Sequence, residues 1–386
     1  GIRVVDLSIN ILGPTATQMM GDMGADIIKV ESPEGDFMRS VGPARNDGMG
    51  AFFLNMNRNK RGVVLDLKDP KSKQALLELL ETADVLIHNM RPGAVERLGL
   101  DYQSLKKRFP NLIYAWASGF RKDSDRRERP AYDDVIQGMS GISDLFKRRS
   151  GTPDYIPSMI ADKLCGYALA FAVSTALLHR ERTGDGQEVH VPMYDTMVSF
   201  NLTDHLWHGV LDEPEKGLGY QRALTPTRRP YATKDGYIAV MASTDAHWSR
   251  MFDLFDRPEL KDDPKYAKAA DRVPRLPELY EWVGEKLTER TTNEWREILD
   301  EVHIPNGPIN TLEDVFNDPY LQDDAFFIRQ KHASEGKIVT MAHTTFYSES
   351  PPSLRLDTPR LGQHTREVLE SIGYSGEELE DILNKQ

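Results

Sequence analysis

The sequence predicts an α/β protein: a large domain built on a mostly parallel sheet, with a smaller α+β domain. Three observations carry this prediction. Strand-like apolar segments alternate with helical segments over the first third of the chain, the composition changes near residues 200–230, and amphipathic helices follow that change. Strands that alternate with helices are typical of parallel sheets covered by helices on both faces. A length of 386 residues suits two domains.

The elements of the large domain are expected in alternating order. A strand at Arg3–Leu7 comes first, and Gly13 and Pro14 open a helix that ends near Gly24. Further strands are expected at 26–30, 62–67, 84–88 and 112–117, and helices at 71–82, 92–98 and 134–141. A long apolar helix then begins near Asp162 and is closed by GDG at 184–186, before a short strand in EVHVPM.

The second half of the chain predicts a hairpin and several helices. TKDGYIAVMAS has an Asp-Gly turn between two strand-like runs, which indicates a hairpin. Helices are expected at 247–255, 274–287, 294–301 and 365–372. We therefore expect a large domain over 1–200, a small domain over 201–330 and a C-terminal segment over 331–386.

Composition limits the function. The formal net charge of −12 argues against general binding to nucleic acid or to an anionic membrane. The longest apolar run, 165–178, is too short to span a bilayer. Cys165 is the only cysteine, which excludes an intramolecular disulfide and fits a reducing compartment. No signal peptide is visible, and we expect a cytoplasmic protein.

Several familiar site patterns are missing. The first glycines stand at 13, 21 and 24, so the tight pair of the dinucleotide fingerprint G-x-G-x-x-G is absent and a nicotinamide cofactor is not expected. No phosphate-binding loop G-x-x-x-x-G-K-[ST] and no nucleophile elbow G-x-S-x-G occurs. His205 and His208 lack an obvious third ligand, so no metal site is expected.

Cations cluster beside predicted strands in this acidic chain: a group of three stands just before the strand at 62–67, Lys68 follows that strand, and the others lie in loops or turns after strands. Because α/β sheets bind ligands beyond the carboxyl ends of their strands, these cations suit a polyphosphate such as a nucleotide or coenzyme A. A solvated surface is the alternative for each residue taken singly. The cations are Arg39, Arg58, Lys60, Arg61, Lys68, Arg91 and Arg97.

Asp162 allows two interpretations. Aspartate is a favoured helix cap, so a structural role is the ordinary explanation. However, Gly166 follows one turn later, and glycine inside a helix costs about 1 kcal/mol relative to alanine, which suggests a close approach by another segment. At a helix N-terminus we expect a lowered pKa for the Asp162 carboxyl and free N–H groups for an oxyanion. Asp162 is thus also a candidate nucleophile.

The ordered set of motifs resembles the family III CoA-transferases, the CaiB/BaiF group that contains formyl-CoA:oxalate and carnitine CoA-transferases. The matching stretches are VVDLSINILGPTATQMMGDMGADIIKVESPEGDFMR, NRNKRGVVLDLK, ADVLIHNMRPGAVERLGL, YDDVIQGMSG, D-x-x-x-G at Asp162–Gly166, ALLHRERTGDGQEVHVPMYD, TKDGYIAV, IPNGPINTLEDVFNDP and LGQHTREVL. The resemblance covers nearly the whole chain.

The resemblance implies roles for individual residues. Asp162 would be the nucleophile, acyl-CoA and a small carboxylic acid the substrates, and no cofactor would be permanently bound. Asn10, Ile11 and Leu12 would lie in the substrate pocket. The implied CoA contacts are Arg39, Leu65, Lys68, Asn89, Met90, Arg91, Arg97, Ala131, Tyr132 and Asp133. The family fold is a Rossmann-like large domain and a small domain, with a C-terminal segment that rejoins the large domain in an interlocked homodimer.

The chain also departs from the family pattern. Ile11 replaces the glutamine of formyl-CoA transferase, the glycine-rich loop between 222 and 242 is missing, and RKDSDRRERP replaces the usual loop after Phe120. We therefore expect an acid that is bulkier or less polar than oxalate or formate. Tyr132 stands where related 2-methylacyl-CoA racemases need a histidine. Racemisation and non-catalytic acyl-CoA binding are the alternatives to CoA transfer.

Overall fold

Two compact units make up the chain in the computed structural model, which describes residues 1–322 and 326–385. The first unit combines residues 1–142, 155–201 and 321–386. The second unit combines residues 143–154 and 202–320. Segments that are far apart in the sequence therefore build each unit.

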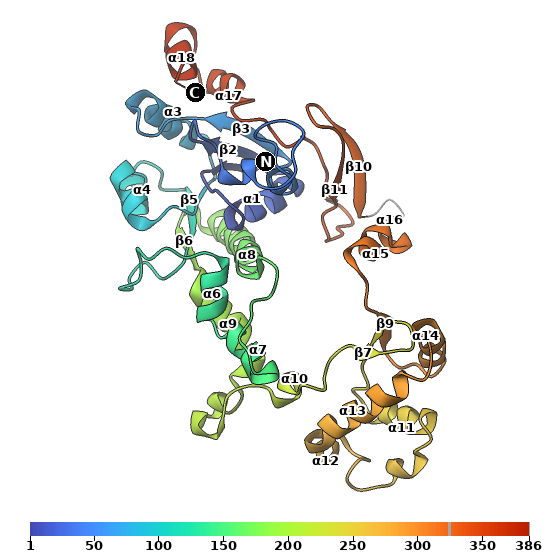
Figure 1. The fold of residues 1–386 in the computed structure, drawn as a ribbon. Helices are drawn as coiled ribbons and strands as arrows, with labels where there is room; N and C mark the ends of the chain where they lie inside the picture. Colours follow the sequence, from blue (N-terminus) through green and yellow to red (C-terminus); the bar gives the residue numbers. More distant parts are fainter. Residues whose placement is uncertain (323–325, 386) are drawn as a thin grey trace. The chain divides into compact units, whose positions relative to one another are not determined.

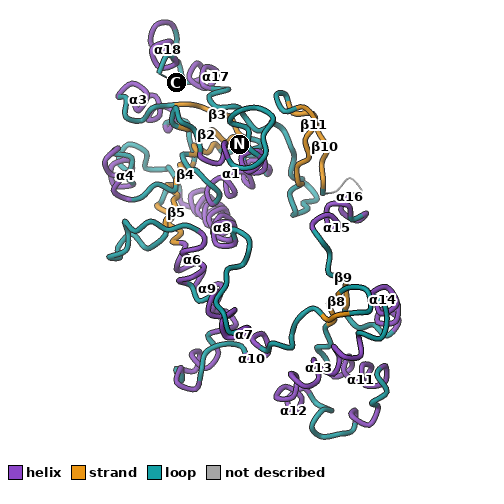
Figure 2. The backbone as a smooth tube through the Cα atoms, viewed as in Figure 1, coloured by secondary structure: helices purple, strands orange, loops and turns teal. Residues whose placement is uncertain are grey.

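A six-stranded parallel sheet forms the centre of the first unit, in the order β3-β2-β1-β4-β5-β6 (Figures 1 and 2). This is the strand order of the doubly wound Rossmann fold, whose direction of winding switches between β1 and β4. The predicted fold class is confirmed. The strands are β1 (Arg3–Asp6), β2 (Asp26–Glu31), β3 (Lys60–Val64), β4 (Val85–His88), β5 (Ile113–Ser118) and β6 (Glu188–Pro192).

Helices cover both faces of this sheet. On one face, Leu76 and Leu79 of α3, Val368 of α17 and Ile382 of α18 share an apolar core with Val5 of β1. On the other face, α1 packs against α8, and α8 also contacts β5 and β6 (Figure 1). The helices are α1 (Leu12–Asp22), α2 (Ala51–Met56), α3 (Pro70–Leu80), α4 (Pro92–Leu98), α5 (Tyr102–Leu105), α6 (Asp133–Met139), α8 (Ile160–Thr183), α17 (Thr365–Ser371) and α18 (Gly376–Leu383); α9 (Met193–His205) begins in this unit.

The contact between α1 and α8 explains the glycine inside α8. A Cβ atom added at Gly166 would lie 2.7 Å from the carbonyl oxygen of Leu12. The close approach expected from the sequence is confirmed, and the backbone of α1 is the segment that makes it. Among the described residues α8 alone has the length and composition to cross a membrane, but a core helix passes the same test. Its packing against α1, β5 and β6 is that of a core helix.

The C-terminal segment attaches to the edge of the sheet. The side-chain oxygen of Asn59 accepts hydrogen bonds from the N–H groups of Arg355 (2.6 Å) and Leu356 (2.9 Å). The N–H group of Gly62 in β3 donates to Nδ1 of His364 (3.0 Å). The start of this segment takes part in an antiparallel hairpin that the sequence did not predict, made of β10 (Phe327–His332) and β11 (Gly336–Met341).

A fully buried group of charges lies beneath the loop that follows β1. Lys29 and Lys60 are both 0% exposed, and Nζ of Lys29 lies 3.1 Å from Asp36 while Nζ of Lys60 lies 3.3 Å from Asp6. Burial lowers the pKa of Lys29, but Asp6, Asp36 and Glu31 outweigh it, so that the pKa is raised overall. Lys29 is therefore a buried ammonium ion held by carboxylates.

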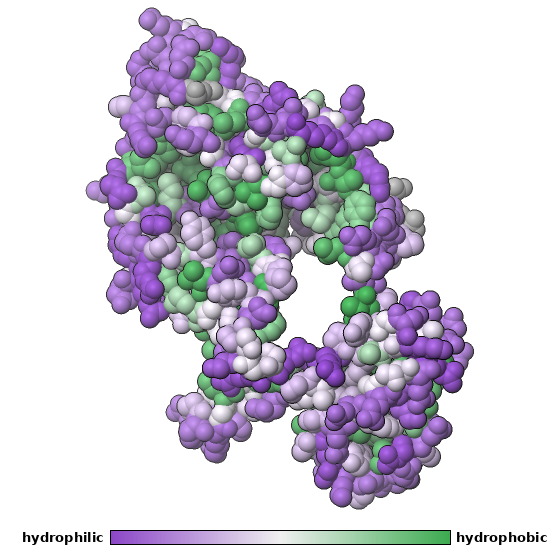
Figure 3. Space-filling view, in the orientation of Figure 1, coloured by the Kyte–Doolittle hydropathy of each residue, from purple (hydrophilic) through white to green (hydrophobic). Residues whose placement is uncertain are grey.

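The second unit has its own core. Its antiparallel sheet, in the order β7-β8-β9, consists of β7 (Tyr231–Ala232), β8 (Tyr237–Val240) and β9 (Asn306–Pro308). Trp248, Phe252, Leu279 and Leu299 are buried together beside it, and the face drawn in Figure 3 is mainly hydrophilic over this unit. The helices are α7 (Ile142–Ser150), α10 (Gln221–Leu224), α11 (Asp245–Leu254), α12 (Ala269–Arg272), α13 (Leu276–Leu287), α14 (Thr292–Glu301), α15 (Leu312–Asn317) and α16 (Pro319–Gln322).

Replacing Lys29 tests the importance of the buried charges. Lys29→Met keeps the length of the side chain but leaves Asp36 buried without its cation, and removing one partner of a buried pair costs about 3–5 kcal/mol. We expect the free energy of unfolding, measured by urea denaturation, to fall by that amount. Lys68→Met, at an exposed lysine, should change it by less than about 0.5 kcal/mol. Equal stability of the two variants would contradict the assignment.

Candidate active site

A cavity of about 630 Å³ lies at the carboxyl ends of β1, β4 and β5 in the first unit. This edge of the sheet, at the switch point between β1 and β4, is where doubly wound proteins bind ligands. Asp162 is among the lining residues. They are Ile9, Asn10, Leu12, Asn89, Met90, Arg91, Ala94, Arg97, Ala117, Ser118, Gly119, Arg127, Glu128, Arg129, Ala131, Tyr132, Asp162 and Met193.

Two side chains hold the loop after β1 against the loop after β4. The amide side chain of Asn89 accepts from the N–H group of Ile9 (2.9 Å) and donates to its carbonyl oxygen (2.7 Å). Asn10 has a φ of 67°, a left-handed conformation that asparagine tolerates, and its N–H group donates to Asp36 (3.1 Å). Asn10 and Asn89 therefore line the cavity and also fix its wall.

Asp162 is the third residue of α8 and lies partly buried at the cavity. Met159 occupies the N-cap position, and Asp162 does not cap the helix. Within residues 1–322 and 326–385, no hydrogen bond or ion pair to the Asp162 carboxylate is found; its N–H group donates to Asp133 (3.0 Å). A carboxylate without a partner, facing a cavity, is available to react.

The pKa of Asp162 corrects the expectation from the sequence. Burial, with a further contribution from the negative charge of Asp133, raises the pKa of Asp162 to about 7. The field of a helix N-terminus is worth typically about 0.3–1 kcal/mol, less than one pKa unit, so burial outweighs it. The expected lowering of the pKa was wrong.

The start of α8 also offers fewer donors than expected. The N–H groups of Ile160, Asp162 and Lys163 already donate to Ser158, Asp133 and Met159. These three groups are therefore not free for an oxyanion.

Asp133 lies behind the cavity wall. It is 3% exposed, and its carboxylate accepts from the N–H group of Asp162 and from the side chain of Gln137 (2.5 Å). Asp133 thus joins the start of α6 to the start of α8, and it raises the pKa of Asp162 from this position. Among the described residues, no group of three or more His, Cys, Asp or Glu side chains could hold a metal ion.

Four arginines line the cavity. Arg91 and Arg97 were predicted, whereas Arg127 and Arg129 come from the charged loop at 121–130 and were missed. Arg127 forms ion pairs with Glu96 (2.7 Å) and Glu128 (3.1 Å). The position of the loop is the signal that could have identified Arg127 and Arg129. The loop follows the carboxyl end of β5, at the same edge of the sheet as Arg91 and Arg97.

A second wall is formed where Ala131 approaches the end of β5. A Cβ atom at Gly119 would lie only 2.3 Å from Cβ of Ala131, so glycine is required there. The contact brings Ala131 and Tyr132 to the cavity, and Tyr132 is 66% exposed.

Some predicted site residues lie outside the cavity lining. Arg39 is 5% exposed and pairs with Glu31 (2.6 Å), with its guanidinium 3.7 Å from the ring centre of Phe53. Leu65 and Ile11 are buried at 1% and 6% exposure. Lys68 is exposed on the turn after β3.

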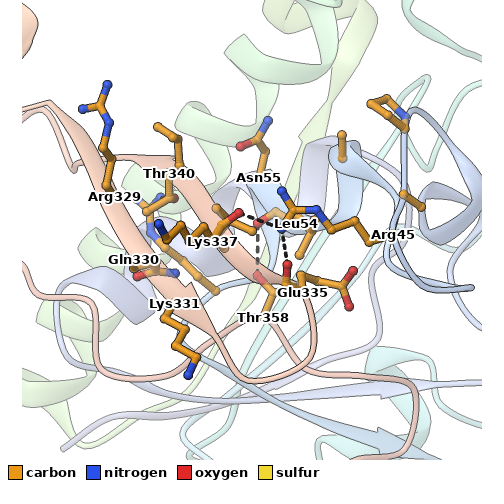
Figure 4. Close-up of a pocket in the computed structure, with 16 residues that line it drawn as sticks. Arg45, Leu54, Asn55, Arg329, Gln330, Lys331, Glu335, Lys337, Thr340 and Thr358 are labelled. Carbon is orange, nitrogen blue, oxygen red and sulfur yellow. Dashed lines mark hydrogen bonds between the residues drawn. The ribbon is translucent and has the colours of Figure 1, made fainter.

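A larger cavity of about 880 Å³ lies elsewhere in the first unit, between the β10–β11 hairpin and α2 (Figure 4). Arg45 donates hydrogen bonds there to the carbonyl oxygens of Glu335 and Lys337, and Thr358 donates to that of Leu54. Asp162 and the predicted CoA contacts do not line it; Arg58, one of the predicted cations, does, but it is paired with Asp22 (2.6 Å). The smaller cavity at the switch point is therefore the candidate active site.

The titration of Asp162 can be measured directly. By carboxyl ¹³C NMR we expect a transition near pH 7, and Asp133→Asn should lower it because loss of the neighbouring negative charge favours the ionised form. Asp134→Asn makes the same charge change at an exposed neighbour and should leave the transition nearly unchanged. A transition near pH 4 in the unaltered protein would contradict the burial argument.

Comparisons with known proteins match nearly the whole chain. Residues 1–365 match the model of CoA-transferase family III. The chain is 31% identical to succinyl-CoA:glutarate CoA-transferase of Mus musculus, with 99% of this chain and 88% of that protein covered. It is 30% identical to succinyl-CoA:mesaconate CoA-transferase of Haloarcula hispanica, with 96% of each covered.

A solved structure has the same fold. A CaiB/BaiF family protein from Brucella suis superposes with a TM-score of 0.81 at 30% identity, covering 96% of this chain and 98% of that one. The family match, the relatives and the shared fold all extend over nearly the whole chain. The chain therefore belongs to CoA-transferase family III.

Proposed function

We propose that the protein is an acyl-CoA:carboxylate CoA-transferase whose nucleophile is Asp162. One observation carries the proposal: the unpartnered carboxylate of Asp162 lies in the same cavity as four arginines. The cavity thus combines a group that can attack a thioester with cations that suit the phosphates of CoA. Membership of CoA-transferase family III supports the same chemistry.

The first half of the reaction moves CoA onto the protein. A carboxylate oxygen of Asp162 attacks the thioester carbonyl carbon, the carbon–sulfur bond breaks, and CoA leaves as a thiolate with a mixed anhydride left on Asp162. The thiolate then attacks the aspartyl carbonyl carbon of the anhydride. The donor acid leaves as a carboxylate, and an aspartyl-CoA thioester remains.

The second half reverses these steps with another acid. The acceptor carboxylate attacks the aspartyl thioester carbon and expels CoA as a thiolate. The acceptor and Asp162 are then joined in a second anhydride. The thiolate attacks the acyl carbon of the acceptor, and the Asp162 carboxylate is released with the new acyl-CoA. Each intermediate keeps the activation of the original thioester, so the exchange needs no nucleotide triphosphate.

The raised pKa of Asp162 serves this scheme. A carboxylate whose pKa is about 7 is more basic than an exposed aspartate, and it is therefore a better nucleophile toward a thioester carbon. At neutral pH about half of the molecules carry the reactive, ionised form. The negative charge of Asp133, behind the cavity wall, contributes to the raised pKa of Asp162.

The arginines would hold the nucleotide part of CoA. Arg91, Arg97 and Arg129 are exposed in the cavity, and guanidinium groups bind phosphate oxygens in pairs. While the nucleotide part of CoA stays bound, the thiolate is kept near the anhydride between the steps. Contacts of CoA with Arg39, Leu65 and Lys68 stay predictions.

A small dicarboxylic acid is the proposed acceptor. The relatives are named for transfer from succinyl-CoA to glutarate and to mesaconate. Apolar side chains of Ile9, Leu12 and Met193 line part of the cavity and would accompany the carbon chain of such an acid.

We also propose a homodimer. Tyr167, Phe171 and Leu178 are 52%, 72% and 46% exposed and recur on one side of α8 at intervals of four and seven residues. A stripe of large apolar side chains on a helix favours burial against another chain.

Asp162→Asn tests the nucleophile. We expect transfer between acyl-CoA and a free acid to fall by at least about 10³-fold, because the covalent path is lost. In the unaltered protein, donor acyl-CoA followed by hydroxylamine should leave a hydroxamate on Asp162, detected by mass spectrometry of peptides. Asp134→Asn is the matched control and should keep its activity. Normal turnover by Asp162→Asn would refute the mechanism.

Arg97→Gln tests the role of the arginines. Loss of one charge-assisted hydrogen bond, worth about 1.5–3 kcal/mol, should raise KM for acyl-CoA by roughly tenfold or more while kcat changes little, since the contact is equally present before and during the reaction. Arg108→Gln, which removes an arginine outside the cavity, should leave both constants unchanged. An unchanged KM in Arg97→Gln would place CoA elsewhere.

A further inference from the structure

The second unit contains a cavity of its own, about 570 Å³ in volume, beside the β7-β8-β9 sheet. Its lining includes Arg149 at the end of α7 and Arg228 and Arg229 in the segment TPTRRP that precedes β7. Tyr231 and Tyr280 provide aromatic walls. None of these residues is among those that line the candidate active site.

Hydrogen bonds fix the side chain of Arg149 and the backbone of Arg228 at this cavity. Nη2 of Arg149 donates to the carbonyl oxygen of Arg228 (2.7 Å), and the N–H group of Arg228 donates to the carbonyl oxygen of Thr225 (3.1 Å). Arg149 and Arg228 are half-buried, while Arg229 is exposed. The segment is thus a turn fixed to α7, with two adjacent guanidinium groups at one cavity.

These positive charges lack a carboxylate partner. Among the residues that the structure describes, no aspartate or glutamate lines the cavity, and no ion pair involves Arg149, Arg228 or Arg229. The chain as a whole carries a formal net charge of −12, so acidic side chains are plentiful elsewhere. Three arginines gathered without a counter-charge repel one another, and a bound anion would offset that repulsion.

A fourth arginine strengthens the positive potential and orients the aromatic wall. Nε of Arg222 donates to the hydroxyl oxygen of Tyr280 (2.8 Å), and Nη2 lies 3.0 Å from the sulfur of Met241. Burial raises the pKa of Tyr231, while Arg228, Arg222 and Arg229 act in the opposite direction. The positive charges of these arginines thus act on the Tyr231 ring, which lines the cavity.

We propose that this cavity binds the oxyanion group of a small organic acid or phosphate ester, with Arg228 and Arg229 as the binding residues. A guanidinium fork matches the geometry of a carboxylate or a phosphate, and the rings of Tyr231 and Tyr280 contact the carbon part of the ligand. The site goes beyond the proposed CoA transfer, since none of its lining residues is among those assigned to that reaction.

Calorimetric titration of the whole protein at low ionic strength tests the site, with glutarate and inorganic phosphate as separate probes. At least one probe should bind, more weakly as salt is added. Binding of glutarate alone assigns a carboxylate ligand, and binding of phosphate alone assigns a phosphate ester. The double variant Arg228→Gln/Arg229→Gln should weaken the binding at least tenfold.

Two matched variants separate this site from the first unit and from general charge effects. Lys265→Gln/Lys268→Gln removes two exposed charges from the same unit and should leave the affinity unchanged. Arg97→Gln, in the cavity of the first unit, should also leave it unchanged. If the double arginine variant does not fold, the exposed Arg229→Gln alone should still weaken binding severalfold. No binding of either probe, or equal binding by the arginine variants, would overturn the proposal.

Discussion

The candidate active site depends on the buried charges beneath the loop after β1. Nζ of Lys29 donates to the carbonyl oxygen of Ser8 (2.8 Å) and pairs with Asp36, whose other oxygen accepts from the N–H group of Asn10. Asp6 accepts from both the N–H group (2.9 Å) and the hydroxyl group (2.5 Å) of Ser8. Such charges are costly to bury unless every partner is in place, so this network permits one conformation of the loop.

That single conformation determines the shape of the cavity. The loop carries Asn10 and Leu12 at its end, and Leu12 begins α1, whose backbone approaches Gly166 of α8. Because Asp162 lies one turn before Gly166, the close contact between the two helices also places the carboxylate at the switch point of the sheet. The contacts that stabilise the loop thus also position Asp162. A change in the buried charges would move α1, and through α1 it would alter the position of Asp162.

Local sequence patterns were sufficient for the fold class and most of the elements. The helix at 92–98 was placed correctly at both ends, and the strands of the parallel sheet were placed within two or three residues, because apolar runs and Gly or Pro signals are local. The β10–β11 hairpin, α7, α9 and α18 were missed, as were α2, α15 and several one-turn helices. The hairpin strand FIRQKH has two apolar residues followed by four polar ones, so it lacks the alternation of a half-buried strand, and α9 has almost no apolar face.

For the site, residue type and spacing indicated the strand-end arginines and a close neighbour at Gly166, and they left Asp162 as either a helix cap or a nucleophile. The family resemblance favoured the nucleophile. The three-dimensional packing decided the rest. It raised the pKa of Asp162 by burying it beside Asp133, paired Arg39 with Glu31, and brought Arg127 and Arg129 to the cavity. Burial and pairing depend on residues that are distant along the chain, and no local pattern records which of them will meet.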